Sequence, residues 1–352
     1  MSKINFYPGP SRVYSNITEY IYEAYKDGIL GINHRSLEFM ELQKKTKRLI
    51  KERLAIPDDY EVLFVSSATE AWEIIPQSLV RKRVQCFYNG AFGEKWQDYT
   101  MNLALEVVST PFEINATLPV DKLDEKAEWI FITQNETSNG TMVAMDTLGE
   151  LNAQKQGNQL IAVDATSSMA GIKLDFSLAD IWFASVQKCF GLPAGMAVMV
   201  VSPAAIERSF DLGERGHYNS FLRIVENHRK NQTHHTPNVL LIYLLCRTMN
   251  ISKGIDYIDD KIRKRYDAWK SVVDDVSALS WLVEDDDLRS RTVLALHYNH
   301  TGHLKKIANQ SDIILGNGYG QWKDSSIRIA NFPAIKSKEI DKLVRFLKRN
   351  LD

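Results

Sequence analysis

The feature that most constrains the fold is a series of short apolar runs that alternate with helical patterns from about residue 60 onward. Most of these runs carry apolar side chains at consecutive positions, without the polar alternation of a half-exposed strand. Apolar strands separated by helices are typical of a mostly parallel sheet buried on both faces. The sequence therefore predicts an α/β domain with strands at EVLFVS (61–66), QCFYNG (85–90), EWIFITQ (128–134), QLIAVDAT (159–166), DIWFASV (180–186) and GMAVMVVS (195–202). The intervening helices are expected at ATEAWEIIPQSL, at FGEKWQDYTMNLAL and near 146–155.

The last third of the chain follows a different pattern. A long helical stretch, about 236–278, leads into the strand-like runs TVLALHY and IRIANF and the amphipathic helices HLKKIANQ and SKEIDKLVRFLKRN. This mixture indicates a smaller α+β domain. We therefore expect residues 1–250 to form an N-terminal arm and a large domain, and residues 251–352 to form the small domain.

Composition argues for an ordinary globular protein and against several classes of partner. The 352 residues are 44% hydrophobic and carry a net charge of −1, so no overall field favours nucleic acid or anionic lipid. No apolar stretch approaches the roughly 18 residues of a membrane span, and the opening MSKINFYPGP has no hydrophobic signal core. Cys86, Cys189 and Cys246 lack metal-ligand spacing and are interpreted as reduced thiols. We expect a cytoplasmic protein with no metal, no nucleic acid partner and no membrane association.

Two charged residues stand where predicted parallel strands end. In such sheets ligands collect at the carboxyl ends of the strands. Asp164 ends the run LIAVD, and Lys188 follows the next run, in the stretch SVQKCFGLPAG. Taken alone, the lysine would most often be a solvated side chain and the aspartate a turn cap. Taken together they fit pyridoxal phosphate, which needs an amine for a Schiff base and a carboxylate that keeps its ring nitrogen protonated.

Neighbouring segments supply other contacts that this cofactor needs. The stretch SSAT (66–69) ends a strand and opens a helix, where backbone N–H groups, hydroxyls and the helix dipole favour a phosphate. The same residues also suit an ordinary helix cap with Glu70 in the first turn. Gln187 offers a further donor, and Phe92 offers a face for ring stacking, although a lone aromatic here is more often a core residue.

In their order and spacing, the motifs resemble those of class V, fold-type I pyridoxal-phosphate aminotransferases, and within them most closely the phosphoserine aminotransferases. The similarity runs from NFYPGPS near the start to RIANFPA near the end. Between them lie HRSLEF (34–39), SSATEAWE (66–73), NGAFGEKW (89–96), NETSNG (135–140), VDATSS (163–168), SVQK (185–188) and HHTPN (234–238). The resemblance implies a large domain around a mostly parallel seven-stranded sheet and a smaller α+β C-terminal domain.

The resemblance also implies a role for each residue that matches the family's cofactor site. Lys188 is expected to be the Schiff-base lysine and proton shuttle, and Asp164 the partner of the pyridinium nitrogen. Phe92 takes the stacking position, where the family more often has Trp, and Thr137 is expected to hydrogen-bond the ring hydroxyl. The cofactor phosphate is expected to be held by Ala68, Thr69 and Gln187, with Ser67 nearby.

Other matching residues imply a homodimer with shared active sites. HHTPN matches a segment that reaches into the neighbouring subunit of the family dimer, so Thr236, with His235, is expected to touch the partner's cofactor phosphate. His34 and Arg35 resemble the loop that contributes to binding the substrate's distal group across the dimer. Arg328 matches the arginine that grips the substrate α-carboxylate, a task that suits a bidentate fork.

The substrate is less closely defined than the cofactor. An HRS motif also occurs in alanine–glyoxylate and serine–pyruvate aminotransferases, and two arginine-bearing motifs of many phosphoserine enzymes are absent. This chain has Ala68-Thr69 in the phosphate loop, and GNGYGQWKDSS before Arg328 with Lys323 as its only cation. The resemblance implies a ping-pong transaminase for small amino and keto acids, most like a phosphoserine:2-oxoglutarate aminotransferase of serine biosynthesis. The alternatives are an alanine–glyoxylate or serine–pyruvate type transaminase, and a pyridoxal-phosphate-binding protein without turnover.

Two further features receive structural interpretations. The stretch GNGYG (316–320) superficially resembles a nucleotide loop, but no helical pattern follows it, so a dinucleotide site is not expected. His228, His234 and His235 have no carboxylate or cysteine at ligand spacing, so dimer contacts are favoured over a metal site.

Overall fold

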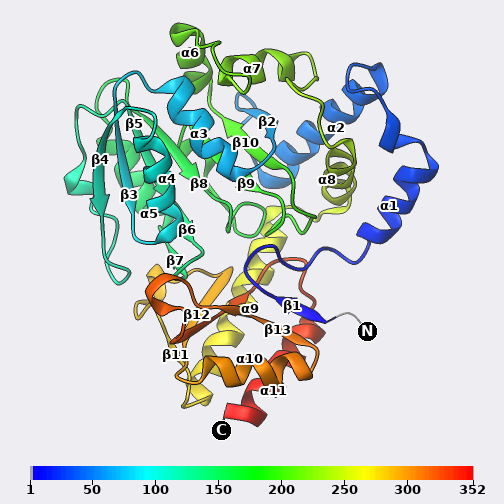
Figure 1. The fold of residues 1–352 in the computed structure, drawn as a ribbon, viewed down its shortest axis with the longest axis vertical. Coiled ribbons are helices and arrows are strands. Elements are labelled where there is room, and N and C mark those ends of the chain that lie inside the picture. Colours follow the sequence, from blue (N-terminus) through cyan, green and yellow to red (C-terminus); the bar gives the residue numbers. More distant parts are fainter. Residues whose placement is uncertain (1–2, 352) are drawn as a thin grey trace.

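The computed structural model describes residues 3–351, which form two parts stacked along the long axis of the molecule (Figure 1). The larger part is built around a seven-stranded sheet. Its strands, in their order across the sheet, are β2 (Glu61–Val65), β10 (Ala197–Val201), β9 (Ile181–Ser185), β8 (Leu160–Asp164), β5 (Trp129–Thr133), β3 (Arg83–Tyr88) and β4 (Glu106–Pro111). β10 is antiparallel to both of its neighbours, and the other adjacent pairs are parallel. The expected mostly parallel seven-stranded sheet is confirmed.

Side chains on both faces of this large sheet are buried, which explains the uninterrupted apolar runs in the sequence. Along β2, Leu63 and Val65 belong to one hydrophobic cluster, while Val62 and Phe64 belong to another. The first cluster is covered by α3 (Ala68–Leu79), α4 (Ala91–Met101), α6 (Pro203–Leu212) and α7 (Phe221–Arg229). The second is covered by α1 (Ile17–Lys26), α2 (Leu37–Leu54), α5 (Met145–Gln154) and α8 (Val239–Ile251).

The smaller part contains a five-stranded sheet. Its strands, in spatial order, are β1 (Ile4–Phe6), β13 (Ile313–Asn317), β14 (Ser326–Ala330), β12 (Val293–His297) and β11 (Ser280–Trp281). The helices of this part are α9 (Ile255–Asp275), α10 (Thr301–Gln310) and α11 (Ser337–Leu351) (Figure 1). β1 pairs in parallel with β13, so the start of the chain adds a strand to the C-terminal sheet. The expected division at residue 250 grouped that strand with the large domain, and the division itself stays a prediction.

Local features differ from the sequence-based expectation in several places. The helical stretch 236–278 is two helices, α8 and α9, and Gly254 in the break between them takes a left-handed φ of +88°. β4 is an edge strand that the sequence analysis does not predict, because its sequence EVVSTP is only partly apolar. A short hairpin, β6 (Asn135–Glu136) and β7 (Thr141–Met142), follows β5. No helix within residues 3–351 is long and apolar enough to cross a membrane.

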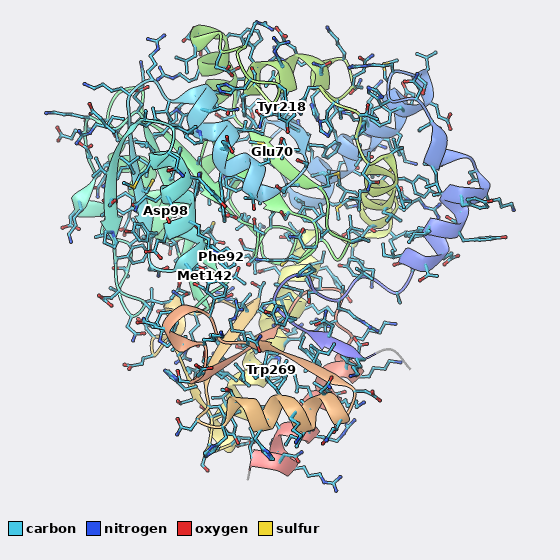
Figure 2. All side chains as sticks on the ribbon, viewed as in Figure 1. Glu70, Phe92, Asp98, Met142, Tyr218 and Trp269 are labelled. Carbon is cyan, nitrogen blue, oxygen red and sulfur yellow. The ribbon has the colours of Figure 1, made fainter. Side chains whose placement is uncertain are left out.

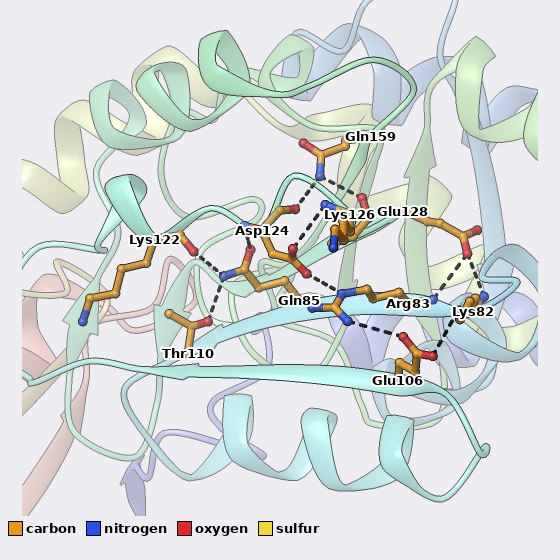
Figure 3. Close-up of polar contacts among 11 residues, drawn as sticks. Lys82, Arg83, Gln85, Glu106, Thr110, Lys122, Asp124, Lys126, Glu128 and Gln159 are labelled. Carbon is orange, nitrogen blue, oxygen red and sulfur yellow. Dashed lines mark hydrogen bonds and ion pairs between the residues drawn. The ribbon is translucent and has the colours of Figure 1, made fainter.

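A dense polar network lies toward the amino-terminal edge of the large sheet, where it joins β3 and β4 to the segments that precede β5 and β8 (Figure 3). The buried side-chain amide of Gln85 on β3 donates to Thr110 Oγ1 and to the Lys122 carbonyl, both at 2.8 Å. Its oxygen accepts the Asp124 N–H at 2.8 Å, and the Asp124 carboxylate accepts from Arg83 Nε at 2.6 Å. Both polar atoms of the Gln85 side chain therefore have partners, and the network fastens β3, β4 and the segment before β5 together.

Candidate active site

Lys188 and Asp164 meet at the carboxyl ends of two adjacent strands. Asp164 is the last residue of β8, and Lys188 follows the end of β9, which pairs with β8 in parallel. Both side chains line one cavity of about 220 Å³. The cavity also receives residues 7–10 of the N-terminal arm and Arg328 from β14, so both sheets contribute to it.

The Lys188 amine is enclosed by hydroxyl groups and an aromatic face. Its Nζ donates to Thr137 Oγ1 at 2.8 Å and to Ser167 Oγ at 2.9 Å, and it lies 5.3 Å from the centre of the Phe92 ring. Burial lowers the pKa of Lys188 to about 8, against the opposing charge of Asp164. A fraction of the amine is therefore neutral near neutral pH, and the neutral form is the one that acts as a nucleophile or base.

The N-terminal arm closes over the aliphatic stem of Lys188. Gly9 takes a φ of +145°, and a Cβ placed on it would lie 2.7 Å from Lys188 Cε. The Ser11 N–H donates to the Gln187 carbonyl at 3.2 Å. Because only glycine permits so close a backbone approach at this φ, the motif NFYPGPS packs directly on the candidate catalytic lysine.

The Asp164 carboxylate is buried and fixed by two donors. Its Oδ2 accepts from Trp72 Nε1 at 2.9 Å, and its Oδ1 accepts from the Thr166 N–H at 2.8 Å. Burial raises the pKa of Asp164, while the hydrogen bonds from Thr166 and Trp72 oppose that rise. A cationic ring nitrogen beside this carboxylate would favour its ionised form.

Glu136, in the motif NETSNG, organises the start of the helix that carries Phe92. Its Oε2 accepts the N–H groups of Phe92 and Gly93, both at 3.1 Å, and its Oε1 accepts the Ser138 N–H at 2.8 Å. A negative charge at the N-terminus of α4 is favoured by the helix dipole. Phe92 lies at the level where the two parts of the molecule meet (Figure 2).

The start of α3 contributes another wall of the cavity. The lining includes three of the four expected phosphate-site residues, namely Ala68, Thr69 and Gln187. Ser67 is not among the lining residues, and its Oγ accepts the Glu70 N–H at 2.9 Å. Ser67 therefore acts as the N-cap of α3, which is the ordinary role considered for this stretch. The Ala68 N–H already donates to Ser185 Oγ at 2.9 Å.

Arg328 presents one free edge to the cavity. Its Nε donates to the Asn317 carbonyl and its Nη1 to the Thr137 carbonyl, both at 2.7 Å. Within residues 3–351, Nη2 makes no hydrogen bond. Burial lowers the pKa of Arg328. Two backbone carbonyls thus orient the guanidinium and leave donors available for an anion.

Four expected site residues lie outside the cavity of their own protomer, namely His34, Arg35, His235 and Thr236. Arg35 Nη1 instead donates to Asn227 Oδ1 at 3.1 Å and to Gln232 Oε1 at 2.5 Å. The resemblance assigns these four residues to action across a dimer, and their roles stay predictions.

His228 is a core residue, so the interpretation of this histidine as a dimer contact is wrong. It is 1% exposed, its Nε2 accepts the Phe64 N–H at 2.8 Å, and its Nδ1–H donates to the Ile224 carbonyl at 3.0 Å. Burial lowers the pKa of His228 to about 3, so the ring is neutral at ordinary pH. Among residues 3–351, no group of three or more side chains is placed to hold a metal ion.

Several lining residues are not among those that the sequence analysis singles out, and they include Trp72, Asn135 and Tyr319. Trp72 lies four positions after Ala68, and this helical spacing places both residues on one face of α3. Asn135 begins the NETSNG motif, two positions before Thr137. Tyr319 lies in the glycine-rich stretch 316–320, and no local signal links that stretch to residues near position 92.

Buried polar atoms without partners test whether pyridoxal phosphate fits this cavity. Thr133 Oγ1, Thr166 Oγ1 and both polar atoms of the Asn135 side chain are buried with no hydrogen-bond partner in the part of the chain that the structure describes. All three residues line the cavity. Such atoms are costly unless a ligand satisfies them. Together with the Lys188 amine and the Asp164 carboxylate, they suit a polar ring that carries an aldehyde, a basic nitrogen and a phosphate.

Comparisons with known proteins identify the family. The family model described as Aminotransferase class-V matches residues 8–342. A phosphoserine aminotransferase of Rhodococcus opacus (strain B4) is 24% identical over 351 residues, which cover 96% of this chain and 92% of the relative. A crystal structure of a phosphoserine aminotransferase from Cytophaga hutchinsonii is 34% identical, with a TM-score of 0.95 and 99% of both chains covered. An alanine–glyoxylate aminotransferase from Nostoc sp. shares the fold at 18% identity and a TM-score of 0.87, with 100% of this chain and 96% of that chain covered.

Proposed function

The chain belongs to the class-V aminotransferases and is a pyridoxal-phosphate-dependent transaminase, and we propose that it exchanges an amino group between phosphoserine and 2-oxoglutarate in serine biosynthesis. The observation that carries the proposal is the full-length match to the phosphoserine aminotransferase of Cytophaga hutchinsonii. Substrates of this class are small amino acids and keto acids. The reaction is proposed to be ping-pong, because a single cavity serves both the amino donor and the keto acceptor.

Lys188 and Asp164 are the proposed catalytic residues. When bound, pyridoxal phosphate supplies an electron-withdrawing ring that makes the substrate Cα–H acidic. Lys188 holds the cofactor and moves a proton at the substrate Cα, and a pKa of about 8 leaves part of the amine neutral for that transfer. Asp164 keeps a proton on the ring nitrogen, and its hydrogen bonds to Trp72 and Thr166 hold the carboxylate in place.

The remaining contacts of the cofactor are divided between two helices and a turn. Phe92 offers its ring face for stacking, and Thr137 offers a hydroxyl that already lies 2.8 Å from Lys188 Nζ. The phosphate is proposed to lie at the start of α3, where the helix dipole favours an anion and the lining residues are small or polar. The proposed phosphate contacts are Ala68, Thr69 and Gln187, with Ser67 acting through its cap of the helix.

Arg328 is proposed to bind the substrate α-carboxylate. Its two hydrogen bonds to backbone carbonyls fix the plane of the guanidinium before any ligand arrives. A fixed fork binds a carboxylate with less loss of side-chain entropy than a mobile one.

We also propose a homodimer in the cytoplasm, in which His34, Arg35, His235 and Thr236 complete the partner's active site. The first two helices and the segment between them carry large apolar side chains at the surface, including Tyr22, Tyr25, Leu30 and Leu37, which are 67%, 73%, 48% and 79% exposed. Clustered exposed apolar side chains commonly mark protein interfaces. The three cysteines are free and buried, as in reducing compartments. Light scattering that gives the mass of a single chain would refute the dimer.

The proposed reaction is tested by following the visible absorbance of the bound cofactor in purified enzyme mixed with one amino acid at a time. We expect phosphoserine to convert the enzyme with a second-order rate at least roughly 10²-fold above that of serine, because a polar site rejects a substrate that leaves its donors unpaired. Faster conversion by alanine or serine would replace the proposal by a small-substrate transaminase. A coloured protein that no amino acid converts would support cofactor binding without turnover.

A further inference from the structure

The glycine-rich stretch 316–320 carries an aromatic side chain into the candidate active site. The stretch turns tightly between β13 and β14, and a Cβ placed on Gly316 would lie 2.6 Å from the Arg328 carbonyl oxygen. Tyr319 lines the cavity, and its ring packs on Phe92 with the centroids 5.5 Å apart and the planes at 36°. A loop of the small sheet therefore covers α4, the helix that packs on the large sheet and carries Phe92.

Tyr319 holds a lysine beside the cavity. Lys95 lies on α4, one turn after Phe92, and its Nζ donates to Tyr319 Oη at 2.6 Å. The same Nζ lies 5.3 Å from the centre of the Tyr319 ring and 5.7 Å from that of Phe92. Among residues 3–351, no carboxylate lies within the 4.0 Å of an ion pair with Lys95. An ammonium has three donors, so two of them are available to a ligand, and the Tyr319 hydroxyl keeps its own proton to donate.

The same tyrosine also contacts the arginine proposed for the substrate carboxylate. Arg328 Cζ lies 5.3 Å from the centre of the Tyr319 ring. Because Lys95 Nζ lies at the same distance from this ring centre, Arg328 Cζ and Lys95 Nζ are separated by no more than about twice that distance. An amino acid that Arg328 holds by the α-carboxylate, and that carries a second anionic group a few bonds away, has the length to approach the second cation.

We infer that Lys95, positioned by Tyr319, contacts the distal anionic group of the amino-acid substrate, a phosphate monoester or a side-chain carboxylate. The assignment of that group as a phosphate rests on the proposed function. The choice of Lys95 as the cation rests instead on its contacts with Tyr319. The sequence lacks two arginine-bearing motifs of many phosphoserine enzymes, and Lys95 supplies positive charge from a different element. Lys95 is the substrate-contacting residue in this inference, and Tyr319 is a positioning residue.

A purely structural role for the Lys95–Tyr319 pair makes different predictions. The pair joins the large and small sheets, so a tie between them would account for the hydrogen bond without any ligand. Loss of a structural tie would weaken the binding of every ligand to a similar extent and lower the melting temperature. Loss of a ligand contact would weaken only ligands that carry the second anion.

The experiment is calorimetric titration of the holoenzyme with three unreactive probes: 3-phosphoglycerate, glutarate and glycerate, the last of which carries no second anion. We expect Lys95→Met to weaken the binding of at least one of the two probes that carry a second anionic group about 10-fold, equivalent to about 1.4 kcal/mol, and to leave glycerate unchanged. Lys95→Arg is expected to retain most of the affinity. Tyr319→Phe keeps the ring but removes the acceptor, and is expected to weaken the same probe about 3-fold. Lys323→Met is the matched control, because Lys323, like Lys95, is an exposed lysine outside the cavity lining and is close to Tyr319 in sequence. Unlike Lys95, its amine makes no hydrogen bond to Tyr319 within residues 3–351.

Each outcome either supports or overturns the inference. Selective weakening of 3-phosphoglycerate supports a phosphate as the distal group, and selective weakening of glutarate supports a carboxylate. Unchanged affinities in Lys95→Met, equal weakening of all three probes, or an equal effect of Lys323→Met would overturn it. The titration needs no turnover, so failure of the proposed phosphoserine reaction would appear separately, in the half-reaction measurement.

Discussion

The ends of the strands form two edges of the large sheet, an amino-terminal edge and a carboxyl edge. These two edges use buried polar side chains in opposite ways. At the amino-terminal edge, the Gln85 amide makes three hydrogen bonds and leaves neither of its polar atoms unpaired (Figure 3). At the carboxyl edge, the Asn135 amide is 2% exposed, and neither of its polar atoms has a partner within residues 3–351. Both amides are buried by the same fold. Burial alone therefore does not distinguish a structural polar group from one kept for a ligand. Here the difference is that the Asn135 amide is unpaired and also lines the cavity.

This difference has an energetic meaning. A satisfied buried hydrogen bond contributes about 0.5–1.5 kcal/mol to stability, and an unsatisfied buried donor or acceptor costs about 1–3 kcal/mol. The amino-terminal edge stabilises the protein without any ligand. The carboxyl edge reduces stability until a ligand supplies the missing partners, which is the expected state of a site arranged in advance for a cofactor.

The largest expected effect is the loss of turnover on replacing Lys188 by alanine. We expect turnover to fall by at least about 10³-fold, because both the attachment of the cofactor and the proton transfer at the substrate Cα are lost. The melting temperature of the cofactor-free protein should not fall, since a buried amine with a lowered pKa is costly to desolvate. Steady-state assays and calorimetry of the same preparation measure both quantities.

The matched control for this variant is Lys155→Ala. Lys155 is a partly buried lysine that pairs with Asp180 at 3.5 Å, away from the cavity. We expect it to keep normal turnover and to lose a little stability. Turnover of the Lys188 variant at the wild-type rate would contradict the assignment of the catalytic lysine.

A smaller loss of catalytic efficiency, kcat/KM, is expected from replacing Arg328 by glutamine. The variant keeps a side chain that hydrogen-bonds but loses the charged fork, so KM for the amino donor should rise about 10²-fold while kcat changes less. Arg328→Lys should not restore normal KM, because an ammonium does not reproduce the planar fork that the Asn317 and Thr137 carbonyls orient. Equal KM values for wild type and Arg328→Gln would place the α-carboxylate elsewhere.

At the opposite edge, Gln85→Leu should affect stability and spare catalysis. The substitution leaves the Asp124 N–H and the Lys122 carbonyl without their partner, so we expect a loss of about 2–3 kcal/mol in the free energy of unfolding. Denaturant unfolding measures this loss, and kcat and KM should stay within about twofold of the wild type. A drop in turnover without a drop in stability would remove the distinction between the two edges.

Local patterns in the sequence predicted the parts of this molecule that depend on local structure. The apolar runs indicate the central strands because each strand is buried on both faces, and Asp164 and Lys188 are recognisable because each charge directly follows such a run. Residues that act through distant partners gave no such signal. Nothing around Tyr319 indicates that its loop packs on Phe92, and nothing around Gln85 indicates its partners near position 124. The stretch SSAT suits a helix cap and a phosphate cradle equally, and only the structure assigns Ser67 to the cap.

The pH dependence of stability provides a finer test of the carboxyl edge. The pKa of Lys188 is about 8 in the folded protein and 10.5 by its ordinary value, so between these values the unfolded chain binds more protons than the folded one. Stability of the cofactor-free wild type should therefore rise with pH in this window, by about 1–2 kcal/mol over the first 1.5 pH units above 8, relative to Lys188→Met. Urea unfolding of both proteins across this range measures the difference. Parallel curves for the two proteins would show that burial does not disfavour the charged amine.

The smallest expected effect, and the most direct test of the contrast, is that of Asn135→Leu on the protein without cofactor. This change removes a buried amide of similar size to that removed by Gln85→Leu, but here no hydrogen bond is lost within the described chain. We expect the free energy of unfolding to stay within about 1 kcal/mol of the wild type or to rise, because replacing an unpaired polar group by an apolar one removes a desolvation cost. The same variant should retain pyridoxal phosphate more weakly on dialysis, since the amide that it removes is one of the groups that we expect the ligand to satisfy. If Asn135→Leu destabilised the cofactor-free protein as much as Gln85→Leu, the two edges would be equivalent, and the unpaired groups would not mark a ligand site.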